Sequence, residues 1–197
     1  ILNKKCKIFL PTSTPRQKID RIKYFGNTEL DVEILGDTVD ESLEYSKEYS
    51  FENNALFVHP FDDNDVIVGQ SSIAEEIFQK QKNVDYIFVC VGGGGLVSGI
   101  CNYISSFELN TKIICAEPEN ANSLEMSLKN NKITSLDYLD NFVDGAAVKT
   151  VGKRNFHITK DKINEIYSIP KNEICYNIVD VYQNDGIILE PAGVLGL

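Results

Sequence analysis

The chain has 197 residues, of which 43% are apolar, and it carries a formal net charge of −10. This composition is typical of a globular chain that forms one large domain or two small ones. The excess of acidic residues, 29 against 19 basic ones, argues against binding to the phosphate backbone of nucleic acid or to an anionic membrane. No apolar run of the sequence is long enough to cross a bilayer.

Strand and helix patterns alternate from the start of the chain. The predicted elements of this first part are strands at 6–10, 30–35 and 55–59 and helices at 14–26 and 38–52. Their order favours a small parallel sheet. The turn-rich stretch 60–70 follows and is the candidate hinge between two domains, a small mobile one over 1–65 and a larger one over 66–197.

The same alternation continues in the larger domain. The predicted elements are helices at 71–81, 96–107, 120–131 and 172–186 and strands at 85–91, 111–117 and 187–193. Ser72 and Glu75 stand in capping-box register near the start of the first helix. The run 85–91 is almost entirely apolar, which is typical of a strand buried on both faces. The sequence therefore predicts an α/β fold with parallel sheets.

The cysteines and histidines predict neither a disulfide framework nor a metal site. The five cysteines are odd in number and widely spaced, and Cys90 and Cys115 lie within apolar runs. This usage indicates reduced thiols and a cytoplasmic location. His59 and His157 have no partners at the spacing of metal ligands, so no metal is predicted.

Four consecutive glycines separate the predicted strand 85–91 from the helix that follows it, in the run VCVGGGGLVSGI. A strand, a glycine run and a helix in this order present backbone N–H groups at a helix N-terminus, at the carboxyl end of a parallel strand. Such N–H groups favour an anion, most often a phosphate, here held by Gly92, Gly93, Gly94, Gly95 and Leu96. The lysine of a P-loop and the spacing of a dinucleotide fingerprint are both missing. The alternative interpretation is a tight turn that holds no ligand.

Several segments, taken together, resemble a known family. Besides the glycine run, the matching segments are PTSTPRQKIDRIKYFG (11–26), VHPFDDNDVIVGQ (58–70), VDGAAVKTVG (143–152) and ILEPAG (188–193). In order and spacing they resemble the pyridoxal 5′-phosphate (PLP) enzymes of fold type II, the tryptophan-synthase-β fold, and within them the biosynthetic threonine dehydratases. The resemblance implies two open parallel-sheet α/β domains, and it indicates that this chain is incomplete at both ends.

The resemblance also implies a cofactor site and a reaction. PLP would bind with its phosphate on 92–96, with Gly145 passing close to its ring and Glu190 lying near it. The implied reaction converts L-threonine, and L-serine, to 2-oxobutanoate or pyruvate and ammonia, as part of isoleucine biosynthesis. A homo-oligomer, dimer or tetramer, is implied as well. Without the resemblance, Glu190 followed by Pro191 is equally an acidic residue at a helix start.

Three departures from the family pattern limit which residue roles of the family can be assigned to this chain. The Schiff-base lysine of the family, in a Ser-Phe-Lys-x-Arg-Gly run, and its Ser-x-Gly-Asn-His loop do not occur in this sequence, so no catalytic residue is assigned. The 197 residues alone are therefore predicted to be inactive. Glu117 matches one acid of the cation site of serine racemases, but Ser123 stands where a later acid is expected, so no divalent metal is predicted. A serine racemase or another enzyme of this fold, and a catalytically inert fragment, are the alternatives.

Overall fold

The computed structural model describes residues 4–197 and divides the chain into two compact units, one that ends at Val58 and one that begins at His59. We call them the N-terminal unit and the C-terminal unit. Each contains one parallel sheet with helices packed on it. This arrangement confirms the predicted fold class.

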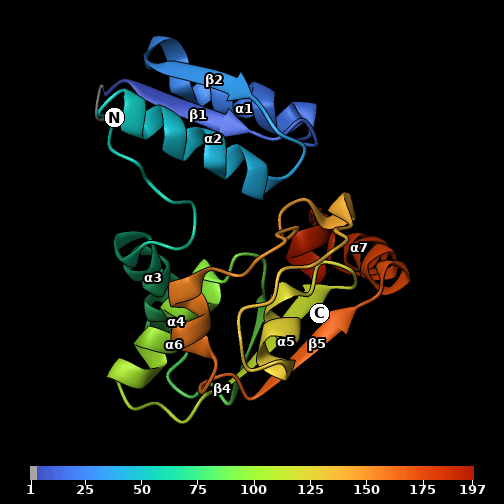
Figure 1. The fold of residues 1–197 in the computed structure, drawn as a ribbon. Coiled ribbons are helices and arrows are strands. Elements are labelled where there is room, and N and C mark those ends of the chain that lie inside the picture. The colour runs from blue at the N-terminus through green and yellow to red at the C-terminus, as the bar shows by residue number, and fades with distance from the viewer. Residues whose placement is uncertain (1–3) are drawn as a thin grey trace. The chain divides into compact units, whose positions relative to one another are not determined.

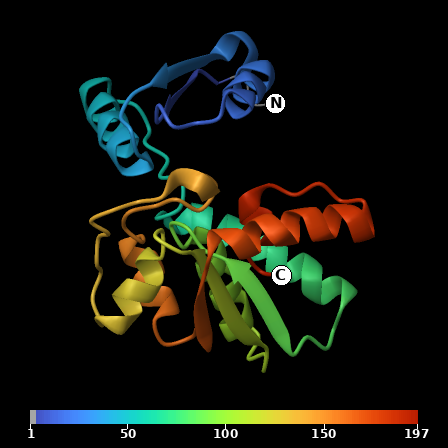
Figure 2. The same cartoon turned by 90° about the vertical axis from the view of Figure 1, so that its right-hand side faces the viewer.

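The N-terminal unit is a two-stranded parallel sheet with one helix on each face (Figures 1 and 2). Its elements are β1 (Cys6–Leu10), α1 (Arg16–Gly26), a 3-10 turn (Asn27–Glu29), β2 (Leu30–Ile34) and α2 (Val39–Glu52). The Thr38 side chain caps α2 by accepting the N–H of Glu41 at 3.2 Å. No residue of α1 is buried, so this unit has a small core.

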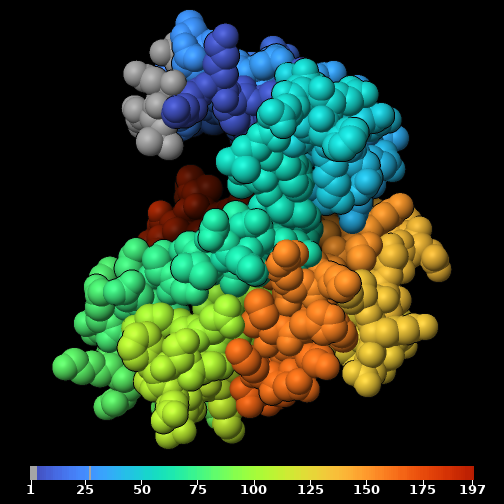
Figure 3. Space-filling view, turned by 60° about the vertical axis from the view of Figure 1, so that its left-hand side comes forward, coloured from blue at the N-terminus to red at the C-terminus, as the bar shows by residue number. Residues whose placement is uncertain are grey.

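The C-terminal unit is built on a three-stranded parallel sheet in the order β3-β4-β5, and α3, α4 and α6 lie side by side (Figures 1 and 3). Its elements are α3 (Asn64–Lys80), β3 (Tyr86–Cys90), α4 (Gly95–Ser106), β4 (Lys112–Pro118), α5 (Ser123–Lys129), a 3-10 turn (Asn141–Val143), α6 (Lys153–Thr159), β5 (Glu165–Ile169), α7 (Lys171–Asp185) and a final 3-10 turn (Pro191–Val194). Across residues 4–197, no helix combines the length and the apolar content that crossing a bilayer requires.

The central strand β4 contributes side chains to two buried clusters. Ile113 and Cys115 join the apolar side chains of α3, α4 and α6, whereas Ala116 joins a second cluster with Ile174 of α7 and Val194. Because successive strand residues point to opposite faces, β4 is buried on both sides of the sheet. Its carboxyl end, where the candidate site lies, is therefore held by packing from two directions.

Most predicted elements are confirmed, with ends that differ by a few residues. The predicted strands at 6–10, 30–35, 85–91 and 111–117 are β1 to β4, and the predicted helices at 14–26, 38–52, 96–107, 120–131 and 172–186 are α1, α2, α4, α5 and α7. The short elements α6 and β5 lie outside every predicted element. Both belong to a largely polar stretch in which no hydrophobic period is long enough to be recognised.

Four predictions for local structure are wrong. Segments 55–59 and 187–193 form no strand, and each exposes an apolar side chain, Leu56 at 90% and Ile188 at 83%. The predicted loop 60–70 ends early, because the Asp63 carboxylate begins α3 by accepting two N–H groups at 2.8 and 3.2 Å. The expected capping box is therefore wrong as well, since Ser72 lies inside the helix. The predicted domain boundary, after residue 65, falls in the first turn of α3.

Strand β3 is covered on one face only, contrary to the prediction that both faces are buried. Ile87 and Val89 are buried, but the alternate residues Tyr86 and Phe88 are 51% and 60% exposed. β3 is an edge strand of the sheet. An apolar run predicts that a strand is present, but it does not reveal whether a second layer of the protein covers it.

Candidate functional site

The glycine loop, residues 92–96, joins the carboxyl end of β3 to α4 through a left-handed turn. Gly94 has φ +91° and ψ 1°, a conformation that residues with a side chain rarely adopt, and α4 begins at the next residue. Because the three strands are parallel, their carboxyl ends lie at one edge of the sheet. The glycine loop therefore lies where open α/β sheets bind ligands.

Five consecutive N–H groups of the glycine loop, from Gly92 to Leu96, donate to no acceptor within residues 4–197. The first backbone bond of α4 is made by the N–H of Ser98, which donates to the carbonyl oxygen of Gly94 at 3.0 Å. Unpaired N–H groups at a helix N-terminus lie at the positive end of the helix dipole. The arrangement therefore has the donors that an anion such as phosphate requires.

The protein itself fills the space beside the Cα atoms of the four glycines. A Cβ built on each glycine in turn, starting at Gly92, would meet the Cα of Ala146 at 3.0 Å, the ring of Phe61, the Cβ of Asn155 at 2.9 Å and the Cβ of Phe61 at 3.1 Å. Internal packing thus excludes a side chain at Gly93 and Gly94 and disfavours one at Gly92 and Gly95. The run alone does not separate an anion site from a bare turn, and the unpaired N–H groups are what favour the anion.

Three segments predicted to form the site meet at this edge of the sheet. Gly92 contacts Ala146, as described, and a Cβ on Gly145 would lie 3.1 Å from the Cβ of Ala192 and 3.3 Å from Oε1 of Glu190. The structure therefore places Gly145 beside Glu190, and both close to the glycine loop. Burial raises the pKa of the nearby Cys90 thiol, and the negative charge of Glu190 raises it further.

Residues 59–63 support the glycine loop from the side of α6. The N–H groups of Phe61 and Asp62 donate to Nδ1 of His59 at 3.2 and 2.9 Å. The Asp62 carboxylate accepts three N–H groups at the start of α6, at 2.8 to 3.3 Å, while Asp63 caps α3. Two adjacent aspartates thus cap two different helices, and Asp62, bound to the start of α6, holds the neighbouring Phe61 against the glycines.

The supporting residues Phe61, Asp62 and Asn155 lie outside the set of site residues predicted from the sequence. The N–H groups that Asp62 accepts come from residues 91 to 93 positions further along the chain. No local pattern can reveal a contact across that separation. The available signal was the pair of aspartates in HPFDDND, because an acidic residue before a helix is a common cap.

Glu117 is the residue that matches one acid of the serine racemase cation site, and its carboxylate forms hydrogen bonds within the protein. It is fully buried, and its carboxylate accepts the N–H groups of Leu124 and Glu125 at 2.9 and 2.8 Å. Burial raises the pKa of Glu117 to about 8, although the two N–H donors oppose the rise. Among the described residues, no three His, Cys, Asp or Glu side chains gather closely enough to hold a metal ion.

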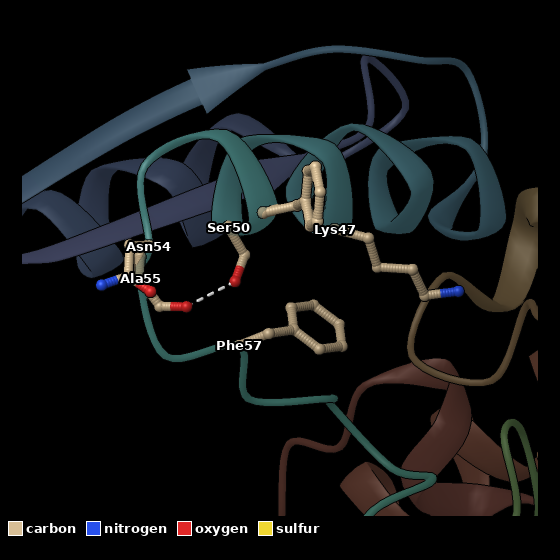
Figure 4. A pocket seen from close by; sticks show the side chains of 6 residues that line it. Lys47, Ser50, Asn54, Ala55 and Phe57 are labelled. Atoms are coloured by element: carbon tan, nitrogen blue, oxygen red, sulfur yellow. Dashed lines mark hydrogen bonds between the residues drawn. The ribbon is translucent and has the colours of Figure 1, made fainter.

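A cavity of about 430 Å³ lies in the N-terminal unit (Figure 4). The residues that line it are Lys47, Ser50, Phe51, Asn54, Ala55 and Phe57. Ser50 Oγ donates to the carbonyl oxygen of Ala55 at 2.6 Å, and none of the lining residues is buried. The cavity contains none of the residues predicted to bind a cofactor, and we assign it no ligand.

Comparison with known proteins identifies relatives along the whole chain. Residues 1–197 match the family described as "Pyridoxal-phosphate dependent enzyme". The chain is 43% identical over 190 residues to the L-threonine dehydratase biosynthetic IlvA of Halalkalibacterium halodurans, covering 96% of this chain and 46% of that protein. It is 39% identical over 201 residues to the protein of the same name from Staphylococcus epidermidis, covering 100% of this chain and 48% of that protein. The chain thus spans about half the length of the curated relatives it matches.

Solved structures share the fold. The processed form of threonine deaminase isoform 2 from Solanum lycopersicum matches with a TM-score of 0.86 and 36% identity, over 96% of this chain and 55% of that chain. The serine racemase of Dictyostelium discoideum matches with a TM-score of 0.81 and 30% identity, over 98% of this chain and 61% of that chain. These similarities confirm the resemblance drawn from the motifs. With the family match over every residue, the chain belongs to the pyridoxal-phosphate dependent enzymes.

Proposed function

We propose that this chain forms part of a PLP-dependent enzyme that converts L-threonine, and L-serine, to 2-oxobutanoate or pyruvate and ammonia. The observation that carries the proposal is the row of five N–H groups of the glycine loop, Gly92 to Leu96, that have no acceptor in the described residues. The 43% identity to a biosynthetic threonine dehydratase supports the choice of substrate and a role in isoleucine biosynthesis.

The residues of this chain supply the phosphate site of the proposed enzyme. The N–H groups of residues 92–96 hold the phosphate, and the dipole of α4 favours its negative charge. Gly145 keeps the adjacent space free of a side chain, and Glu190, whose carboxylate lies beside Gly145, would lie near the bound cofactor. When bound, PLP acts as an electron sink for reactions at the α-carbon of an amino acid. We assign no catalytic residue here, because the lysine motif of the family does not occur in the sequence.

We also propose that the enzyme is a cytoplasmic homo-oligomer that binds neither nucleic acid nor membranes. All five cysteines are free, as is usual for proteins of a reducing compartment. The formal charge of −10 opposes binding to other polyanions.

The test uses the protein expressed with its native flanking coding sequence, incubated with PLP and L-threonine or L-serine, with products identified by mass spectrometry. We expect 2-oxobutanoate from threonine and pyruvate from serine. Formation of D-serine without a 2-oxo acid would instead identify a racemase, the second candidate, which the 30% identity to the Dictyostelium enzyme supports. Absence of any product from a protein with bound PLP contradicts the proposal.

A further inference from the structure

Asn155, near the start of α6, is fully buried against the glycine loop. Its side-chain Nδ2 donates to two carbonyl oxygens, that of Gly93 at 2.8 Å and that of Phe61 at 3.0 Å. A flipped amide would place Oδ1 against both oxygens, so these contacts fix which end of the amide faces the loop. The Gly93 carbonyl oxygen accepts a second hydrogen bond, from the N–H of Gly152 at 3.1 Å.

Two donors on one carbonyl fix the plane of the peptide that joins Gly93 to Gly94. Between residues 4 and 197 no peptide bond is cis. In a trans peptide the N–H points opposite to the carbonyl, so the Gly94 N–H points away from Asn155 and Gly152. The left-handed turn at Gly94 then leads into the first N–H groups of α4. Asn155 therefore sets the direction of one donor in the row.

The other end of the Asn155 side chain indicates that stability alone does not explain this residue. Its Oδ1 is buried and accepts no hydrogen bond from any described residue. An unpaired buried acceptor costs free energy, and most buried amides avoid that cost by pairing both ends. Asn155 carries this cost while its other end holds the Gly93 carbonyl.

We propose that Asn155 is a positioning residue for the anion site, orienting the Gly94 N–H through the Gly93 carbonyl without touching the ligand. This inference rests on the proposed function, namely that the glycine loop holds a phosphate. It extends that function to a residue 62 positions further along the chain than Gly93. Donors fixed before binding give tighter hydrogen bonds than donors that must first reorient.

The experiment measures how much the phosphate group contributes to binding. Pyridoxine 5′-phosphate and pyridoxine differ only in the phosphate, and neither carries an aldehyde that could react with lysines. Fluorescence titration gives both dissociation constants for the wild-type protein, Asn155→Ala, Asn155→Ser and Asn164→Ala. The control, Asn164→Ala, removes an asparagine side-chain hydrogen bond far from the loop, the one that Asn164 accepts from the N–H of Ile113 at 2.8 Å, at the amino end of β4.

We expect the wild type to prefer the phosphorylated compound, Asn155→Ala to reduce that preference about fivefold, and Asn164→Ala to leave it unchanged. If Asn155→Ala does not fold, the phosphate preference of Asn155→Ser, which keeps one small donor, is compared with that of the wild type instead. An unchanged preference in a folded Asn155 variant overturns the inference and leaves the proposed function intact. A wild type that binds both compounds equally overturns the proposed function itself.

Discussion

At the scale of single residues, the ring of Phe61 occupies the place that a side chain on Gly93 would need, and the Cβ and backbone of Phe61 lie against Gly95. Gly69 gives the opposite case, because it lies within α3 with no atom near its missing Cβ. Glycine therefore has a different effect on stability at each of these two positions. At Gly93 a side chain is excluded by packing, whereas at Gly69 glycine only adds freedom to the unfolded chain.

We predict that Gly93→Ala lowers the free energy of unfolding by about 1–3 kcal/mol, because the new methyl group overlaps Phe61. The matched variant Gly69→Ala should raise the same quantity by about 0.5–1 kcal/mol, since alanine suits an open helix position. Urea unfolding followed by circular dichroism measures both. Equal stabilities for Gly93→Ala and the wild type would contradict the packing described for the glycine loop.

Glu117 should make the stability of the protein depend on pH. Burial raises the pKa of Glu117 from 4.5 to about 8, so the folded protein retains a proton that the unfolded chain releases between those values. This contribution to stability is complete below about pH 4.5 and is lost as the pH rises to about 8. Glu117→Gln does not titrate. Its free energy of unfolding should therefore fall less steeply than that of the wild type over this range, as measured by urea unfolding at stepped pH; identical slopes would show that Glu117 does not titrate in the fold.

At the scale of elements, the starts of the helices decide where the sequence prediction succeeds. The glycine run before α4 and the hydrophobic period of α7 are local, so both helices are predictable from neighbouring residues. The start of α3 is misplaced because Asp63, rather than Ser72, caps it. The start of α6 receives its cap from Asp62, in a segment far away in the sequence. A cap supplied by a distant segment leaves no pattern in the helix that it begins.

We predict that Asp62→Ala lowers the free energy of unfolding by about 1–2 kcal/mol, since three N–H groups at the start of α6 lose their acceptor. The phosphate preference defined above should fall as well, because Asp62 is adjacent to Phe61, which contacts the glycine loop. Asp63→Ala is the control for a lost cap, because it should cost a similar free energy at α3 while leaving that preference close to the wild-type value. The same loss of preference in both variants would mean that lost stability, rather than the support of the loop, is responsible.

At the scale of the whole molecule, the two units differ in how much of each is buried. Six of the seven residues of β4 are buried, whereas none of β1 is. The sequence predicts both parallel sheets but not this difference, because the apolar residues of β1, such as Ile8 and Phe9, predict a strand without revealing how much of it the fold covers. The meeting of Gly92, Ala146, Gly145 and Glu190 is likewise a product of the tertiary fold. Only the resemblance to a family, and no local pattern, placed Gly145 and Glu190 in one site with the glycine loop.

We predict that native-state hydrogen exchange is slowest for the amides of β4 and at least about tenfold faster for those of β1 and β2, since exchange follows local burial and packing. Mass spectrometry of peptic fragments from the wild-type protein measures the two groups in one sample. Equal protection of the two sheets would show that the units open together as one cooperative body.

Because Ala146, Phe61 and Asn155 pack directly against the four glycines, folding by itself disfavours larger residues there, most strongly at Gly93 and Gly94. A homologue that no longer bound PLP would still keep glycine at the positions of Gly93 and Gly94, because packing in the fold excludes a side chain there. A search of genomes for this tetrapeptide would therefore return homologues that no longer bind PLP together with homologues that do. The homologues that still bind PLP would be recognised by backbone N–H groups of the glycine loop that remain unpaired and open to an anion.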